Sequence, residues 1–273
     1  MRIDLGCGAH KFRNCIGIDR TSFPDTDLML DFNKPMPFED HSVEFVMASH
    51  SLEYAENLQN MMLELYRVCN HKAVVCIVAP YSNVSSNIVN PQYKQLFNEH
   101  SPRYWTHCSE TLVDEDEFFL SENRAWSLLQ EDAPAIDFRV LRMEFFYLPP
   151  FQQGYEPGEL SLLRQSQMNV AYQIMFHLLV VKKPITNEEI LLIRESGSLE
   201  EPDYVSQQRS VPDIAEAGGP LYFADHLIPL KEKLRKRQAP KKHQRLYSND
   251  SRRQRKSRQR MAEMERRRRA KRR

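Results

Sequence analysis

The sequence predicts an α/β fold, in which a doubly wound, mostly parallel sheet is closed on one side by an antiparallel pair of strands. Over the first 80 residues, short apolar runs alternate with polar turns and one helical stretch, a rhythm typical of parallel strands joined by crossovers. Two longer β-rich runs, at 138–148 and 171–181, are typical of an antiparallel pair. A change in composition near residue 185 marks the end of the predicted globular part.

Short strands and one helix are expected in the first 80 residues. Apolar runs bounded by polar turns predict the strands, at 2–5, 15–18, 28–30 and 43–48. A helix is expected at 58–68, because apolar residues recur there three and four positions apart. The continuous apolar run at 73–79, which Pro80 bounds, predicts a strand buried on both faces.

The rest of the chain divides by composition. Residues 82–135 are expected to form helix and loop over the sheet, and a helix or loop near 160–168 separates the antiparallel strands. The predicted domain therefore covers 1–185. Residues 186–230 hold nine acidic and two basic groups with several prolines, which predicts a largely unfolded acidic linker with one short helix at 187–195.

The net charge of +1 hides a strong asymmetry along the chain. Residues 231–273 contain 21 basic and four acidic groups, whereas residues 1–230 contain 17 basic and 33 acidic groups. We expect a disordered basic tail that binds nucleic acid or another polyanion without sequence specificity, or that stays solvated or folds back on the acidic body. Tyr247 is the only aromatic residue in this tail, so base stacking is not expected to give sequence specificity.

Composition and cysteine usage predict a cytoplasmic protein. No apolar run approaches the length of about 18 residues needed to span a bilayer, and the N-terminus does not have the pattern of a signal peptide. The five cysteines are odd in number and form no CxxC pair, so neither a disulfide framework nor a zinc site is expected.

A glycine turn after the first strand is the strongest indication of a ligand site. Gly6 and Gly8 flank Cys7, and backbone without a side chain can bend sharply there and approach a ligand closely. Asp19 ends the second strand, where a carboxylate can accept hydrogen bonds from both hydroxyls of a ribose. Asp31 ends the third strand in the same way. Together these turns predict a nucleoside-shaped site at one edge of the sheet.

These turns belong to a longer series of motifs. In order, they read Asp4-Leu5-Gly6-Cys7-Gly8, Gly17-Ile18-Asp19, Leu30-Asp31-Phe32, the run from Met36 to Val46, His50-Ser51-Leu52-Glu53-Tyr54 and Glu64-Leu65-Tyr66-Arg67-Val68. The series resembles the class I S-adenosylmethionine-dependent methyltransferases, whose fold is Rossmann-like, and above all their broad bacterial group with a D-x-G-C-G turn. The resemblance covers residues 1 to about 80 and extends weakly to about 183.

The resemblance implies roles for individual residues. Gly6, Cys7 and Gly8 would lie beside the methionine part of the S-adenosylmethionine cofactor, and Asp4 would support that turn. Asp19 would bind the ribose hydroxyls. Asp31 would meet the adenine amino group, with Phe32 beside the ring.

The sequence also departs from the family pattern. Only residues 9–18 separate Gly8 from Asp19, where most members have a longer helix, although a subset with a similar Gly6-to-Lys11 turn is shortened in the same way. Residues 70–73 read Asn-His-Lys-Ala where Lys-Pro-Gly-Gly is typical, and no helix precedes the first strand.

His50 is the candidate catalytic residue. It follows the fourth strand, where family members often place substrate-facing residues, and its ordinary pKa suits a general base. The alternatives are that it only shapes the pocket, or that transfer proceeds by positioning alone with no base. Glu53, His100 and Tyr104 are lesser pocket candidates.

The function expected from these observations is direct methyl transfer from S-adenosylmethionine to an unidentified acceptor. A small molecule or saccharide is favoured, because residues 90–105 resemble a segment of methyltransferases found with surface-sugar genes. Base-amine methylation is disfavoured, since Ala48-Ser49-His50-Ser51 replaces the [Asp/Asn]-Pro-Pro-[Tyr/Phe] motif. Alternatives are a polyanion-binding protein with a non-catalytic, cofactor-binding core, and a methyltransferase that the basic tail directs to RNA or the ribosome.

Overall fold

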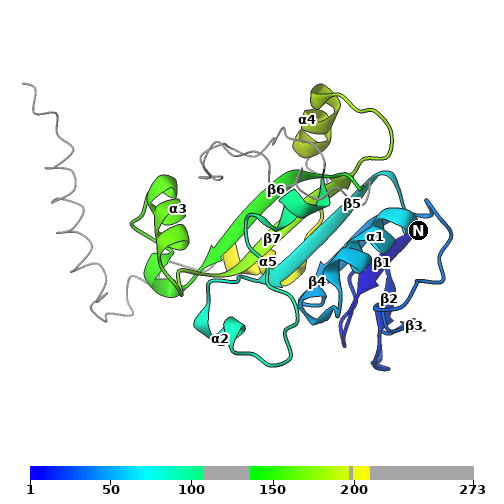
Figure 1. Ribbon diagram of the computed structural model, residues 1–273, viewed down its shortest axis with the longest axis horizontal. Coiled ribbons are helices and arrows are strands. Elements are labelled where there is room, and N and C mark those ends of the chain that lie inside the picture. Colours follow the sequence, from blue (N-terminus) through cyan, green and yellow to red (C-terminus); the bar gives the residue numbers. More distant parts are fainter. Residues whose placement is uncertain (107–135, 197–198, 210–273) are drawn as a thin grey trace, which may run out of the picture. The chain divides into compact units, whose positions relative to one another are not determined.

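The computed structural model describes residues 1–106, 136–196 and 199–209 (Figure 1). All of them belong to the first of two compact units, Met1–Ile214. The expected basic tail at 231–273 lies outside the described residues, as do 107–135 of the segment expected to cover the sheet.

A single mixed sheet organises the described residues, with the strand order β3-β2-β1-β4-β5-β7-β6. The strands are β1 Arg2–Leu5, β2 Ile16–Asp19, β3 Leu28–Met29, β4 Val43–Ser49, β5 Cys69–Pro80, β6 Phe138–Tyr147 and β7 Ala171–Val180. The pairs from β3 to β5 are parallel, whereas β7 pairs antiparallel with both β5 and β6. The predicted sheet and its antiparallel edge are therefore confirmed.

Strand β5 is longer than the apolar run predicted. It starts at Cys69 and includes Asn70, His71 and Lys72, four residues before the predicted start at Ala73. The pairing register with β4 shifts between Val43 and Phe45, and Lys72 has a φ of +67°. This irregularity accommodates a polar stretch within the strand, which the apolar pattern alone does not reveal.

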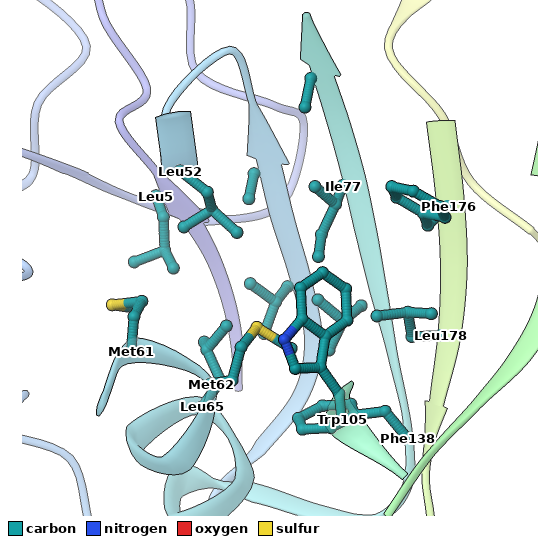
Figure 2. Packing of buried hydrophobic residues seen from close by; sticks show 14 of the residues in the cluster. Leu5, Leu52, Met61, Met62, Leu65, Ile77, Trp105, Phe138, Phe176 and Leu178 are labelled. Carbon is teal, nitrogen blue, oxygen red and sulfur yellow. The ribbon is translucent and has the colours of Figure 1, made fainter. Parts of the chain in front are cut away.

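One face of the sheet packs against helix α1 (Leu58–Val68), whose bounds match the prediction. The helix begins at Asn57, whose side chain accepts a hydrogen bond from the backbone N–H of Asn60 (2.9 Å). Its apolar side meets alternate residues of the strands, as Figure 2 shows for Met61, Met62 and Leu65 beside Leu5 and Ile77. Trp105, from the short 3-10 helix η2 (Ser101–Trp105), lies in the same cluster.

The opposite face is covered by a helix that the sequence analysis did not predict. Helix α5 (Asp203–Arg209) places Val205, which is fully buried, against a cluster that includes Phe45, Met47, Cys76 and Met175. In Figure 1, α5 lies on the far side of the sheet from α1. Since no helix joins β1 to β2, α5 covers sheet surface that a crossover helix would otherwise cover.

The segment after β7 corrects one expectation. Helix α4 (Asn187–Glu195) has the predicted bounds, and α5 follows it, so residues 186–196 and 199–209 are not a largely unfolded linker. Ile190 of α4 packs with Leu141 and Leu179 in a small apolar cluster. The ordered domain therefore continues at least to Arg209, beyond the boundary expected at 185, because single buried side chains anchor segments whose composition is otherwise polar.

Two more α-helices, and the short 3-10 helix η5 (Pro149–Phe151), lie between strands. Helix α3 (Pro157–Ser166) lies between β6 and β7, near the helix or loop expected at 160–168, and α2 (Ser85–Ile88) follows β5. Within the described ranges, no helix has both the length and the apolar character needed to cross a bilayer.

The packing of α5 can be tested by a charge placed at its buried position. Val205→Asp should lower the free energy of unfolding by about 3 to 5 kcal/mol, because it buries an unpaired carboxylate in the apolar cluster with Phe45 and Met175. Leu192→Asp on α4 is the matched control, because Leu192 is 67% exposed. This variant should change the free energy of unfolding by about 0.5 kcal/mol or less. Denaturant unfolding measures both, and equal effects would contradict the packing described.

Candidate functional site

The site begins at the glycine turn after β1. Gly6 has a φ of +69° and Gly8 a φ of +54°, which are left-handed conformations that glycine adopts without strain. The backbone N–H groups of Gly6 and Cys7 both donate to the carbonyl of Ile18 (2.7 and 3.1 Å). The turn is thereby held at the carboxyl end of β2. In parallel sheets, ligands bind at the strand ends where the strand order reverses, which here is between β1 and β4.

Gly6 also allows the turns after β1 and β4 to touch. A Cβ atom built on Gly6 would lie 2.4 Å from the Cβ of Ser51, a separation that real atoms do not adopt. Around Gly8, by contrast, such an atom would have nothing within 4 Å. Gly6 therefore closes the contact between the two turns, while the backbone at Gly8 borders open space.

The carboxylate of Asp19 joins β2 to the same turn. Its Oδ2 accepts a hydrogen bond from Gly8 N–H (3.1 Å), and its Oδ1 accepts one from Thr21 N–H (2.9 Å). A carboxylate has lone pairs for further donors, so these two bonds orient Asp19 and leave it able to accept others. The structure thus brings Gly6, Gly8 and Asp19 together, as the sequence analysis expected.

Asp31 lies beside this group and extends it along the sheet edge. Leu30 N–H donates to the carbonyl of Asp19 (2.9 Å), which holds the end of β3 beside the end of β2. Asp31 Oδ1 accepts from the backbone N–H and the side-chain amide of Asn33 (3.1 and 2.9 Å). Phe32 is half-buried and packs against the main core cluster.

Asp4 and Cys7 are directed inward rather than toward the strand ends. Asp4 is buried and accepts a hydrogen bond from Phe12 N–H (2.7 Å). Burial raises the pKa of Asp4 to about 6, and the bond from Phe12 offsets only part of this effect. The Cys7 thiol is also buried, 3.8 Å from the hydroxyl of Thr26, so these two side chains support the turn from beneath.

His50 lies directly after β4, across the Gly6–Ser51 contact from the glycine turn. Its φ of +51° is unusual for a residue with a side chain, and its backbone N–H donates to Val78 O (2.8 Å). Its Nε2 is 3.0 Å from Oε1 of Gln173, and because an amide oxygen can only accept, Nε2–H is the donor. The ring is 43% exposed, so a bound molecule can reach it.

Glu53 lies behind His50, in the short helix η1 (Leu52–Tyr54). Its Oε1 is 3.6 Å from Nδ1 of His50, longer than a hydrogen bond. Burial lowers the pKa of His50, but the nearby Glu53 carboxylate, together with the hydrogen bond to Gln173, raises it overall above the ordinary value.

Helix α5 reaches this group from the far end of the described chain. The side-chain amide of Gln173 donates to Oε1 of Gln208 (3.2 Å), and the Tyr204 hydroxyl is 2.8 Å from the Ser49 hydroxyl. The ring of Tyr204 lies 6.2 Å from that of His50. Sequence reasoning missed Gln173, Tyr204 and Gln208, because no motif links residues more than 100 positions apart in the chain.

The other two lesser candidates belong to the segment around η2. His100 precedes η2 and Tyr104 lies within it, with 46% of Tyr104 exposed. In the described part of the chain, no group of three His, Cys, Asp or Glu side chains is arranged to hold a metal ion.

The family comparison can now be set beside this geometry. Residues 16–77 match a family model described as "Methyltransferase domain". The matched segment starts after the glycine turn and includes Asp19, Asp31, His50 and Glu53. A search of curated proteins gives no match.

Solved structures with a similar arrangement include two SAM-dependent methyltransferases. The enzyme from Archaeoglobus fulgidus is 15% identical, with 65% of this chain and 85% of that chain covered and a TM-score of 0.43. The enzyme from Aquifex aeolicus is 14% identical, with 66% and 81% covered and a TM-score of 0.36. Both identities and both scores are low.

The match over residues 16–77 is to a methyltransferase domain, and the strand order is compatible with the fold of such domains. The order β3-β2-β1-β4-β5 is that of a Rossmann-like sheet, with β7 inserted antiparallel beside β5. S-adenosylmethionine is the cofactor that this similarity implies.

The residues at the strand ends fit that cofactor. Open space beside Gly8 gives a ligand close access to the backbone, and Asp19 has lone pairs that remain for ribose hydroxyls. The buried Ser51 hydroxyl, next to Gly6, has no hydrogen-bond partner within the described residues. An unsatisfied polar atom of this kind is typical of a place where a ligand supplies the partner.

Substitution of the two glycines tests this geometry. Gly6→Ala should lower the free energy of unfolding by about 3 kcal/mol or more, because the new methyl group overlaps Ser51 in an unfavourable backbone conformation. Gly8→Ala should cost only about 1 to 2 kcal/mol, from backbone strain without a clash. Denaturant unfolding gives both values, and a Gly8→Ala variant as unstable as Gly6→Ala would refute the difference.

Proposed function

We propose that this protein transfers a methyl group directly from S-adenosylmethionine, bound across the carboxyl ends of β1, β2 and β3, to an acceptor held beside His50. The observation that carries this proposal is the hydrogen-bonded connection of the Gly6–Gly8 turn to Asp19, and of Asp19 to the strand that precedes Asp31. It brings to one sheet edge the groups that an adenosine needs.

Each residue has a proposed role in cofactor binding. Gly6, Cys7 and Gly8 would present backbone to the methionine part, and Asp4 would support their turn. Asp19 would accept hydrogen bonds from the ribose hydroxyls, while Asp31 would accept one from the adenine amino group and Phe32 would lie beside its ring. When bound, the cofactor supplies a methyl group on a positively charged sulfur.

His50 would act as general base on the acceptor. Its exposed ring lies at the carboxyl end of β4, next to the turn that would hold the cofactor, and transfer needs the two reacting groups in line and close together. Removal of the acceptor's proton as the new bond forms prevents charge from building up on the product.

A small molecule or saccharide is the favoured acceptor. Tyr54 follows His50 by four residues, and its ring meets that of Tyr93 edge to face at 5.5 Å, while the ring of Tyr204 lies 6.2 Å from that of His50. Aromatic rings beside a carboxylate and a histidine suit a molecule with apolar faces and polar edges. We propose that the reaction takes place in the cytoplasm.

Binding of the cofactor is tested by calorimetric titration with S-adenosylmethionine. Asp19→Ala should weaken binding by about 10- to 100-fold, because it removes a charged acceptor of hydrogen bonds. Asp25→Ala, on the loop between β2 and β3, should bind as the unchanged protein does. Equal affinity in the Asp19 variant would remove the support for the site.

Methyl transfer is tested with labelled S-adenosylmethionine and a cell extract fractionated into RNA, protein, glycan and small molecules. Label in the glycan or small-molecule fraction is expected. Cofactor binding without any labelled fraction would favour the alternative of a polyanion-binding protein with a non-catalytic core.

The charge of residues 231–273 favours a second candidate function, in which the tail directs the enzyme to RNA or the ribosome. Deletion of 231–273 separates the candidates when the extract assay is repeated at two salt concentrations. Guidance by the tail predicts that deletion lowers labelling of RNA or protein, and that salt lowers it only when the tail is present. Unchanged product formation would show that the tail does not deliver substrate.

A further inference from the structure

Glu53 is a buried carboxylate without a hydrogen bond from any described residue. Its side chain is only 1% exposed, and neither Oε1 nor Oε2 has a hydrogen-bond partner in the part of the chain that the structure describes. Its backbone, in contrast, is well connected, since the carbonyl of Glu53 accepts from the N–H groups of Lys94 and Gln95 (2.7 and 3.0 Å). The segment is therefore firmly placed, and only the carboxylate is unsatisfied.

A buried carboxylate without a partner lowers the free energy of unfolding. We therefore expect it to act when a ligand is bound or during a reaction. His50 can form a cation beside this carboxylate, because its Nδ1 lies 3.6 Å from Oε1 of Glu53. A neutral imidazole carries one N–H, and Nε2 already uses it to reach Gln173. Nδ1 is then the nitrogen with a free lone pair, and the carboxylate lies close to it.

Burial disfavours the protonated form of His50, whereas Glu53 and Gln173 favour it. Glu53 of η1 faces Nδ1 with a charge, and Gln173 of β7 faces Nε2 with an amide oxygen. From α5, Tyr204 faces the ring, and its own hydroxyl is engaged with Ser49. An imidazolium donates from both nitrogens, so it would meet an acceptor on each side.

The amide of Gln173 is held in the orientation that this arrangement requires. Its Nε2 donates to Gln208 of α5 (3.2 Å), which directs its oxygen toward His50. Gln173 is buried, at 2% exposed, so water does not compete strongly for this bond.

We propose that Glu53 and His50 form a proton-accepting pair, in which Nδ1 of His50 takes a proton from the methyl acceptor and Glu53 positions the ring and stabilises the resulting imidazolium. This inference rests on the proposed function and extends it to the chemical class of the acceptor. The acceptor carries an O–H or N–H group that loses its proton during transfer. A nucleophile with no proton to lose, such as a thioether or a tertiary amine, would have no use for the pair.

The proton balance of the step is complete with these groups. A lone pair on the acceptor's oxygen or nitrogen forms the new bond to the methyl carbon, and the electron pair of the broken carbon–sulfur bond remains on sulfur. The acceptor's proton moves to Nδ1 of His50. The positive charge that began on sulfur is then on the imidazolium, next to the Glu53 carboxylate.

Substitution of Glu53 tests the pair without any knowledge of the acceptor. In the unchanged protein, NMR titration should give His50 a pKa above its ordinary value, and Glu53→Gln should lower it. Because the folded-state pKa is raised, the pair stabilises the fold at pH below the unfolded value, and this contribution is lost as pH rises through the folded-state pKa. The decrease in stability with rising pH should be smaller in Glu53→Gln. Glu56→Gln, at an exposed neighbour, is the matched control and should behave as the unchanged protein.

A second variant separates this role from a structural one. At a pH above the folded-state pKa of His50, Glu53→Met should raise the Tm by about 2 °C or more, because it replaces an unpartnered buried carboxylate with an apolar group of similar length. In the extract assay, Glu53→Gln should lower the maximal rate by about 10- to 100-fold. It should also move the rise of rate with pH to lower pH, since the base must be unprotonated.

An unchanged His50 pKa in Glu53→Gln would overturn the proposal, as would a Tm that falls in Glu53→Met. Failure of the proposed function is a different result: the unchanged protein would then not bind S-adenosylmethionine, while the His50 titration and the Tm could still be measured. Normal labelling by Glu53→Gln, with cofactor binding intact, would contradict the proposed Glu53–His50 pair but not the proposed function.

Discussion

The site depends on one close approach, between the turn after β1 and the turn after β4. Residue 6 must lack a side chain, because a Cβ there would lie 2.4 Å from that of Ser51. This contact sets the distance between the turn proposed to hold the cofactor and His50, which immediately precedes Ser51. The cofactor side and the acceptor side of the site are thus coupled through backbone, which moves less than side chains do.

The acceptor side is assembled from three distant parts of the chain. His50 and Glu53 follow β4, Gln173 belongs to β7, and α5 supplies Tyr204 and Gln208. The antiparallel pairing of β7 with β5 places the start of β7 at the carboxyl end of β5, so Gln173 lies opposite Pro80. An antiparallel edge on a parallel sheet therefore adds side chains to the ligand-binding end that a purely parallel sheet would not provide.

The spacing of apolar residues predicted those helices and strands that bury a regular apolar face. The bounds of α1 and α4 were predicted, as were most of β1, β4 and β7, because burial of one or both faces leaves a clear signal in the sequence. Helix α5 leaves none, since Val205 alone among its residues is fully buried. At the site, motifs indicated Asp19 and His50, whereas Gln173 and Gln208 follow only from strand pairing over long separations.

Coverage of the second sheet face by α5 has a consequence for synthesis of the chain. Strand β1 is made about 200 residues before α5, yet Arg2 forms its ion pair with Glu200 (2.8 Å), and the neighbouring apolar cluster is completed by Val205. Until α5 has left the ribosome, Phe45 and Met47 have no α5 over them. The nascent chain therefore carries an open apolar surface while the segment between β4 and α5 is made, and exposed surface of this kind favours aggregation.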